Sequence, residues 1–245
     1  MKTVAVVLAA GSGSRMKSQT KKQFISILDK PLIYYSISAF ERSFIDEIVI
    51  VTGEDDIEYV KNEIVKKYDF KKVTAVTAGG RERYHSVMNG INAVNGCDYI
   101  FIHDGARPML DESILDRALK KVISTGAAVV GMPAKDTVKI ADENGMVDIT
   151  PNRNSVWTIQ TPQVFEFELI KKAYSDVISR EEELKADGIN ITDDSMVLEV
   201  STSHKVALVE GSYENIKVTT PEDIILAETF LKNRNSYVNQ ECGKV

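Results

Sequence analysis

Short apolar runs alternate with amphipathic segments through the first half of the chain. The runs are rich in Val and Ile, which favours buried strands, and they cover Val4–Leu8, Glu47–Val51, Val73–Val76, Tyr99–Ile102 and Ala127–Val130. Between them, apolar residues recur at helical spacing in Leu32–Phe40, Ile57–Tyr68, Tyr84–Val94 and Ser113–Ser124. This alternation predicts an α/β fold with a mostly parallel central sheet and helices on both faces. In such folds the ligand binds beyond the carboxyl ends of the strands.

The pattern changes between residues 133 and 152. Polar and apolar positions alternate in Asp136–Ile140 and in Met146–Thr150, on either side of a segment that ends in Asn144-Gly145. Asn-Gly between alternating segments predicts a β-hairpin. An isolated hairpin is only marginally stable, so we expect this one to pack against a second subunit.

The remainder of the chain returns to a core-like pattern. We expect a late strand at Val206–Val209 and a closing helix at Pro221–Leu231, with Thr220 as its N-cap. The polar tail at 233–245 is expected to be frayed. The chain is therefore predicted to form one domain over residues 1–232, from which a hairpin arm projects at about 133–152.

Composition narrows the class of protein. The 245 residues are 43% hydrophobic and carry a net charge of −6, which argues against a general nucleic-acid or membrane surface. No apolar run approaches the ~18 residues of a membrane span, and the first strand begins too early to leave room for a signal peptide. The two cysteines, Cys97 and Cys242, lack metal-ligand spacing and are expected to be free cytosolic thiols. We therefore expect a cytoplasmic enzyme.

The strongest chemical signal is the loop that follows the first predicted strand. It carries Gly11 and Gly13, which allow a sharp turn with backbone N–H groups facing an anion, and it adds the cations Arg15 and Lys22. The loop lacks the Gly-Lys-Ser/Thr ending of a Walker A motif, and Met16 stands where a dinucleotide fingerprint needs a third glycine. Although a glycine pair alone is compatible with a plain surface turn, the added cations favour a polyphosphate site.

Two further segments end at the same predicted edge of the sheet. Asp104 closes the run Tyr99–Ile102 and is a candidate Mg²⁺ ligand, since Mg²⁺ takes one or two carboxylates beside phosphate oxygens; the alternative is an ordinary turn or capping aspartate. The stretch Gly79–Val87 includes Ser86, whose hydroxyl can bond a base edge. It is a candidate base pocket, although by itself it predicts only a turn and a helix start.

Four other cations stand out in so acidic a chain. They are Arg107 after the aspartate, Lys139 on the hairpin, Arg153 beyond it and Lys217 in an alternating segment. For a single lysine, a solvated position is the default interpretation.

Eight motifs in this order and spacing resemble the family of 2-C-methyl-D-erythritol 4-phosphate cytidylyltransferases. They are LAAGSGSRM, KKQF, GGRERYHSV, HDGARP, KDTVK, QTPQVF, TDDSMVLE and GSYENIKVTTPED, and the likeness runs from about Thr3 to Leu231. The chain departs from the family pattern at Lys21, where Pro is more usual, and at Gly105, where Ala is common. Neither departure removes a functional group. The resemblance implies a Rossmann-like nucleotidyltransferase fold and transfer of CMP from CTP to methylerythritol phosphate.

The resemblance also implies a role for each matching residue. Arg15 and Lys22 would stabilise charge at the α-phosphate of CTP, while Arg153 and Lys217 would position the substrate phosphate. The expected CTP contacts are Ala10, Gly11, Gly13, Gly80, Arg81, Ser86 and Asp104, with Asp104 holding Mg²⁺. Thr161 and Thr192 would assist with methylerythritol phosphate. Thr137 and Arg107 would reach substrate in the other subunit, so that the hairpin becomes the arm of a homodimer.

The chemistry implied agrees with the residue types. A phosphate nucleophile is ionised near pH 7, so no catalytic base is needed, and the work is to align two anions and neutralise charge at phosphorus. One alternative is the same reaction on ribitol 5-phosphate. Another is a non-catalytic nucleotide-binding module, although such a module would not need every charged site position. A Rossmann dehydrogenase is disfavoured by Met16.

Overall fold

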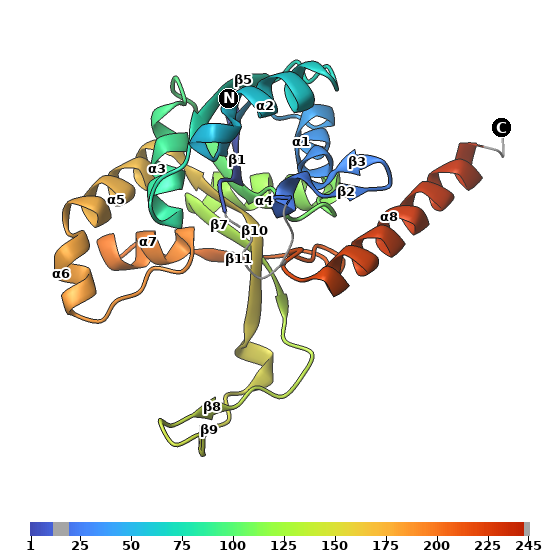
Figure 1. Cartoon of the computed structure of the whole chain (residues 1–245). Coiled ribbons are helices and arrows are strands. Elements are labelled where there is room, and N and C mark those ends of the chain that lie inside the picture. The colour runs from blue at the N-terminus through green and yellow to red at the C-terminus, as the bar shows by residue number, and fades with distance from the viewer. Residues whose placement is uncertain (12–19, 243–245) are drawn as a thin grey trace.

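The computed structural model describes residues 1–11 and 20–242, with side chains up to residue 234. Its centre is a seven-stranded sheet in the order β11-β7-β10-β6-β1-β4-β5 (Figure 1). The strands are β1 (Thr3–Ala9), β4 (Glu47–Thr52), β5 (Val73–Ala78), β6 (Tyr99–Asp104), β7 (Ala127–Pro133), β10 (Trp157–Glu166) and β11 (Ala207–Glu210). All neighbouring pairs are parallel except those that β10 makes with β6 and β7. The predicted mostly parallel sheet is confirmed.

Helices cover both faces of the sheet, and β1 is apolar at every position after Thr3. Ala5 and Val7 pack into one core cluster with helices α1 and α4, whereas Val4 and Val6 pack into the other with α3, α5 and α7. Opposite faces of a strand take alternate residues, and a run that is buried on both sides reads as continuously hydrophobic. The helices are α1 (Leu32–Arg42), α3 (Arg83–Asn92), α4 (Glu112–Thr125), α5 (Phe167–Ser179) and α7 (Asp194–Ser201).

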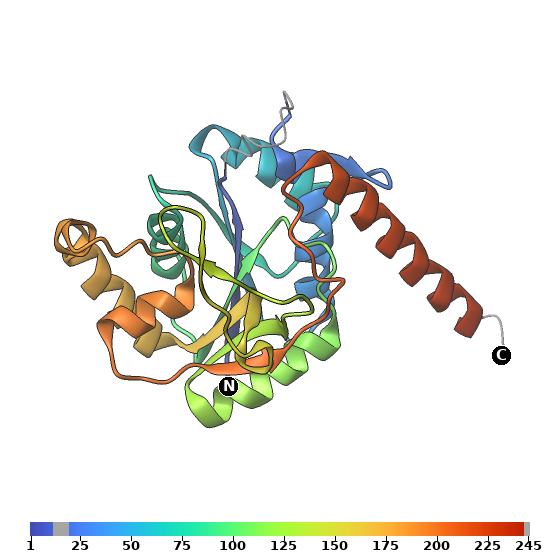
Figure 2. The ribbon, with the colours of Figure 1, turned by 90° about the horizontal axis from the view of Figure 1, so that it is seen from below.

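Several boundaries differ from the sequence prediction. The helix predicted at Ile57–Tyr68 is a short α2 (Ile57–Tyr59) continued by a π-helical stretch, Val60–Lys66. The closing helix α8 (Pro221–Cys242) runs well beyond Leu231, so the predicted end of that helix is wrong. Figure 2 shows α8 projecting away from the body, where no core limits its length.

The segment between residues 157 and 201 holds elements that the hydrophobic pattern did not predict. β10 joins β6 to β7 and carries Gln160, Thr161 and Gln163, which are all buried. Its register shifts between Ile159 and Gln163, so a simple alternation is broken. Because these buried side chains are polar, the hydrophobic pattern does not predict this central strand. Helices α5, α6 (Glu181–Ala186) and α7 then follow.

The hairpin arm is present but its strands are shorter than predicted. β8 (Ile140–Ala141) pairs antiparallel with β9 (Val147–Ile149), and the arm extends from the body in Figure 1. Gly145 has a φ of 77°, and the Asp142 carboxylate accepts hydrogen bonds from the Asn144 and Met146 amides. A second small ribbon, β2 (Ser26–Ile27) with β3 (Lys30–Pro31), leads into α1.

The membrane and cysteine predictions can be compared with the structure. No helix in the described part of the chain is long and apolar enough to cross a membrane. Cys97 forms no disulfide, and burial raises the pKa of its thiol to about 12. The side chain of Cys242 lies outside the described residues.

Candidate active site

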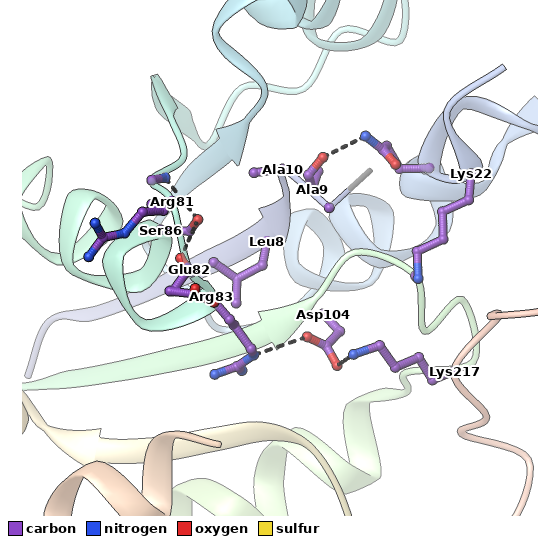
Figure 3. Close-up of a pocket in the computed structure, with 14 residues that line it drawn as sticks. Leu8, Ala9, Ala10, Lys22, Arg81, Glu82, Arg83, Ser86, Asp104 and Lys217 are labelled. Atoms are coloured by element: carbon purple, nitrogen blue, oxygen red, sulfur yellow. Dashed lines mark hydrogen bonds and ion pairs between the residues drawn. The ribbon is translucent and has the colours of Figure 1, made fainter. Parts of the chain in front are cut away.

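A cavity of about 440 Å³ opens at the carboxyl ends of β1 and β6, as the fold class predicts (Figure 3). It is framed by the residues after β1, the turn into α3, the end of β6 and the segment before α8. Its lining residues are Leu8, Ala9, Ala10, Gly11, Lys22, Gln23, Gly80, Arg81, Glu82, Arg83, Ser86, Asp104, Ala106 and Lys217. Eight of the predicted site residues therefore meet in one cavity: Ala10, Gly11, Lys22, Gly80, Arg81, Ser86, Asp104 and Lys217.

The first wall comes from Ala10 and Gly11, directly after β1, and from the short 3-10 helix Lys22–Phe24. The buried Gln23 amide donates to the Ala9 carbonyl at 2.6 Å and so ties that helix to the end of β1. The neighbouring Lys22 ammonium donates to the Val218 carbonyl at 3.3 Å. Lys22 is thus held beside the segment that carries Lys217, although 195 residues separate the two. Gly13 and Arg15 lie outside the described residues.

Asp104 is the charged centre of the cavity. Its carboxylate lies 2.8 Å from the Lys217 ammonium, 3.6 Å from Arg107 Nε and 3.8 Å from Arg83 Nε (Figure 3). Burial opposes ionisation of this group, but the three cations outweigh it and hold the pKa of Asp104 well below its usual range. Asp104 is therefore an anion under all physiological conditions.

A buried hydrogen-bond chain fixes the backbone beneath Asp104. His103 Nε2 lies 3.3 Å from the Arg107 carbonyl, which can only accept, so Nε2 carries the proton and Nδ1 accepts from the Thr161 hydroxyl at 3.0 Å. That hydroxyl in turn accepts from the Asp104 amide at 3.0 Å. Burial lowers the pKa of His103 to about 4, which keeps the ring neutral. His103 is fully buried and serves this hydrogen-bond chain.

The turn between β5 and α3 forms the opposite wall. Ser86 Oγ accepts from the Gly80 amide at 2.9 Å and donates to the Glu82 carbonyl at 3.2 Å, which closes the turn. A Cβ at Gly79 would lie 2.4 Å from Ala10 Cβ, and one at Gly80 would lie 2.4 Å from His85 Cβ. Glycine at position 79 therefore allows the two walls to approach closely, and glycine at position 80 allows the turn to pack against the start of α3.

Arg83 lines the cavity and is a residue that the sequence analysis missed. Its guanidinium donates to both carboxylate oxygens of Asp194, at 2.6 and 2.7 Å, and also faces Asp104. Asp194 is fully buried, and Tyr174 donates to it as well. Bidentate pairing of this kind orients an arginine firmly. The motif GGRERYHSV contains Arg83, but its partners come from helices that no local pattern predicted.

Five predicted residues do not line the cavity. Arg153 and Thr137 are exposed on the arm, where Arg153 contacts the Lys135 carbonyl at 3.3 Å. Thr192 is exposed and contacts only Met196 among the hydrogen bonds found for it. Thr161 is 4% exposed, and its hydroxyl serves the chain beneath Asp104.

Arg107 is the fifth of these residues. Its guanidinium donates to the Asn215 carbonyl at 2.8 Å and faces Asp104 of its own chain, and its contact with substrate in the other subunit stays a prediction. The side chain is only 11% exposed. The attraction of a buried carboxylate explains this inward direction.

The residues present suit a magnesium ion that arrives with a polyphosphate. Asp104 supplies one ionised oxygen ligand at the cavity wall. No group of three or more His, Cys, Asp or Glu side chains in the described chain could hold a metal unaided. Mg²⁺ commonly binds through one carboxylate, phosphate oxygens and water, so this donor set fits a nucleotide-borne ion.

Comparison with known proteins agrees with this geometry. The family model described as 2-C-methyl-D-erythritol 4-phosphate cytidylyltransferase matches residues 3–233. Proteins of that name from Lachnoclostridium phytofermentans and Clostridium perfringens are each 46% identical, over 97% and 94% of this chain and 99% of each relative.

A solved structure gives the same result. The 4-diphosphocytidyl-2C-methyl-D-erythritol synthase of Anaerococcus prevotii superposes with a TM-score of 0.81 at 34% identity, covering 94% of this chain and 96% of that one. The fold, the cavity at the strand ends and the match over nearly the whole length agree. The chain belongs to the 2-C-methyl-D-erythritol 4-phosphate cytidylyltransferase family.

Proposed function

We propose that this chain transfers CMP from CTP to 2-C-methyl-D-erythritol 4-phosphate, giving 4-diphosphocytidyl-2-C-methyl-D-erythritol and pyrophosphate. The observation that carries the proposal is the meeting of Lys22, Asp104 and Lys217 with the turn into α3 in one cavity. Family membership supplies the substrate class.

The reaction is a direct displacement. A phosphate oxygen of methylerythritol phosphate attacks the α-phosphorus of CTP, a new P–O bond forms, and the bond to the β-phosphate breaks with its electron pair leaving on pyrophosphate. No side chain needs to remove a proton, because the attacking phosphate is already ionised. The enzyme therefore works by alignment and by charge stabilisation.

The cations divide this work. Lys22 stabilises the charge that develops at the α-phosphate, together with Arg15 of the glycine loop, and Lys217 holds the phosphate of the second substrate. In this structure the Lys217 ammonium forms an ion pair with the Asp104 carboxylate at 2.8 Å. Asp104 would hold Mg²⁺, which when bound offsets the negative charge of the triphosphate and supplies Lewis acidity at its oxygens. The backbone around Ala10, Gly11 and Gly80 accommodates the nucleotide, and Ser86 the cytosine.

The arm supports a second part of the proposal, a homodimer. Thr137 and Arg153 do not reach the cavity of their own chain, and the arm exposes the apolar side chains Met146, Val147 and Ile149. We propose that the arm packs on a second copy and delivers Thr137 and Arg153 to the other cavity. Thr161 then acts from beneath Asp104, and Thr192 remains a predicted contact of the sugar phosphate.

Pyrophosphate release tests the activity directly. With CTP and Mg²⁺, we expect release with methylerythritol phosphate and little or none with ribitol 5-phosphate. Release only with ribitol 5-phosphate would keep the mechanism but replace the substrate. Binding of CTP without release with either acceptor would indicate a non-catalytic nucleotide-binding protein.

A further inference from the structure

Glu181, the first residue of α6, lies in an unusual cluster behind the turn that forms the nucleotide wall. Its carboxylate is 2.7 Å from an Arg81 guanidinium nitrogen, 2.7 Å from the Tyr84 hydroxyl, 2.5 Å from the Lys185 ammonium and 3.0 Å from His85 Nε2. Although α6 is a surface helix, the Glu181 side chain is only 13% exposed. The Glu181 carboxylate thus contacts four polar or charged side chains.

Three of those four groups belong to one short segment. Arg81 lies in the turn from β5 into α3, and Tyr84 and His85 lie in the first turn of α3, about 100 residues before Glu181 in the chain. The same turn presents Gly80, Arg81, Glu82 and Ser86 to the cavity. One side of this segment therefore lines the proposed cytosine pocket, and the opposite side is bonded to Glu181.

The directions of the side chains support this division. In Figure 3 the Arg81 guanidinium points away from Asp104 and Lys217, whereas Arg83 points toward Asp104. The Tyr84 and His85 rings pack against each other with centroids 4.5 Å apart, so both meet the same carboxylate. Hydrogen bonds from Lys185, Tyr84 and Arg81 lower the pKa of Glu181 to about 2, so the cluster retains its charge at neutral pH.

We propose that Glu181 is a positioning residue for CTP: it fixes the turn of residues 79–86 from behind, through Arg81, Tyr84 and His85, so that the Gly80 backbone and Ser86 meet the base in place. This inference rests on the proposed function. It assigns the Arg81 side chain to anchoring the turn, while the Arg81 backbone remains at the cavity. The hydrogen bonds of Ser86 are local, and Asp194 holds Arg83 separately, so Glu181 is the carboxylate that attaches Arg81, Tyr84 and His85.

Substitution of Glu181 tests the proposal without disturbing the core. In Glu181→Ala we expect the dissociation constant for CTP, measured by calorimetry, to rise about tenfold, since charge-assisted hydrogen bonds are the strong ones. The KM for methylerythritol phosphate and the kcat at saturating CTP are expected to stay within about twofold of wild type. Glu182→Ala is the matched control, because Glu182 is the next residue on the same helix and is exposed.

A second variant and a second readout complete the test. Tyr84→Phe removes one hydroxyl donor to Glu181 and keeps the ring, so it should raise the CTP dissociation constant by about threefold to tenfold with no unfolding. Amide hydrogen exchange without nucleotide should be about tenfold faster at residues 80–82 in Glu181→Ala than in Glu182→Ala.

The outcomes separate the two proposals. If wild-type protein binds no CTP, the proposed function fails, while the exchange measurement still tests the attachment of the turn. If wild type binds CTP and both Glu181→Ala and Tyr84→Phe bind it equally well, or if exchange at residues 80–82 is unchanged, the role of Glu181 is overturned. An equal loss for both substrates would also contradict it, because a general structural defect would not distinguish them.

Discussion

The cavity and the arm differ in burial and in the contacts that hold their residues in place. Asp104 at the cavity wall is 8% exposed and faces three cations of its own chain, whereas Val147 on the arm is 59% exposed and belongs to a strand with no buried residue. The cavity is positioned by strand ends that the core holds in place. The arm has no core of its own. A two-stranded ribbon is marginally stable by itself, so the cavity is prepared by folding, whereas the arm is the region that the proposed dimer would hold.

The largest effect should come from the cavity. We predict that Lys22→Ala lowers kcat by about 10²–10³, the typical loss when one preorganised charge donor is removed. The melting temperature should change little, since Lys22 lies at the edge of the cavity. The control is Lys21→Ala, which removes a neighbouring lysine that pairs with Asp56 at 2.6 Å. Steady-state kinetics of both variants measures the effect. Near-normal turnover in Lys22→Ala would refute the role of Lys22 in stabilising charge at the α-phosphate.

The next effect concerns the arm. Arg153→Ala should lower kcat/KM for methylerythritol phosphate by about 10- to 100-fold, comparable with loss of a charged contact to phosphate. If the arm serves the other subunit, mixing Arg153→Ala with Lys22→Ala at equal amounts should restore activity. About a quarter of wild-type activity is expected, because half of the dimers are mixed and each has one complete site.

That mixing experiment has a clear negative result. If activity does not rise above that of the two separate variants after subunit exchange, with mixed dimers demonstrated by tagged pull-down, Arg153 does not complete the other cavity. The arm would then have to be regarded as a structural element only.

A smaller effect is expected on stability at the cavity wall. Asp104→Asn leaves three cations facing one another and should reduce the free energy of unfolding by about 1–3 kcal/mol at pH 7. The folded-state pKa of Asp104 is depressed, so its contribution is complete above the unfolded pKa of about 4 and is lost as pH falls below it. Denaturation of both proteins from pH 7 to pH 3 should show the difference shrinking only in the acid range. A constant difference would contradict the ion-pair explanation.

The smallest effect should be seen in the arm's apolar residues. Val147→Ser and Ile149→Ser should weaken the proposed dimer by about tenfold, since each removes apolar area from the contact, while the monomer's stability changes by less than about 0.5 kcal/mol. Ile225→Ser is the control, because Ile225 is 71% exposed on α8, outside the arm. Analytical ultracentrifugation measures the dissociation constant, and a monomeric wild type would reject the dimer.

The alternation of apolar runs and helices was enough to predict the sheet and the edge where ligands bind. The glycine loop, Asp104 and the turn Gly79–Ser86 were found from sequence because each follows an apolar run directly, so their meeting at one edge follows from parallel strand direction. β10 was not found, since Gln160, Thr161 and Gln163 interrupt its apolar pattern while making buried hydrogen bonds.

Local pattern thus determined which residues stand at strand ends and which chemistry they offer, because strand periodicity and glycine turns depend on neighbours in the chain. The partners of those residues depend on contacts between segments about 100 residues apart. Arg83 meets Asp194 and Arg81 meets Glu181 only once the helices pack on the sheet, and Arg107 donates to the carbonyl of Asn215. Which opposite charges pair depends on their distance in the folded structure, and burial then sets the strength of their interaction.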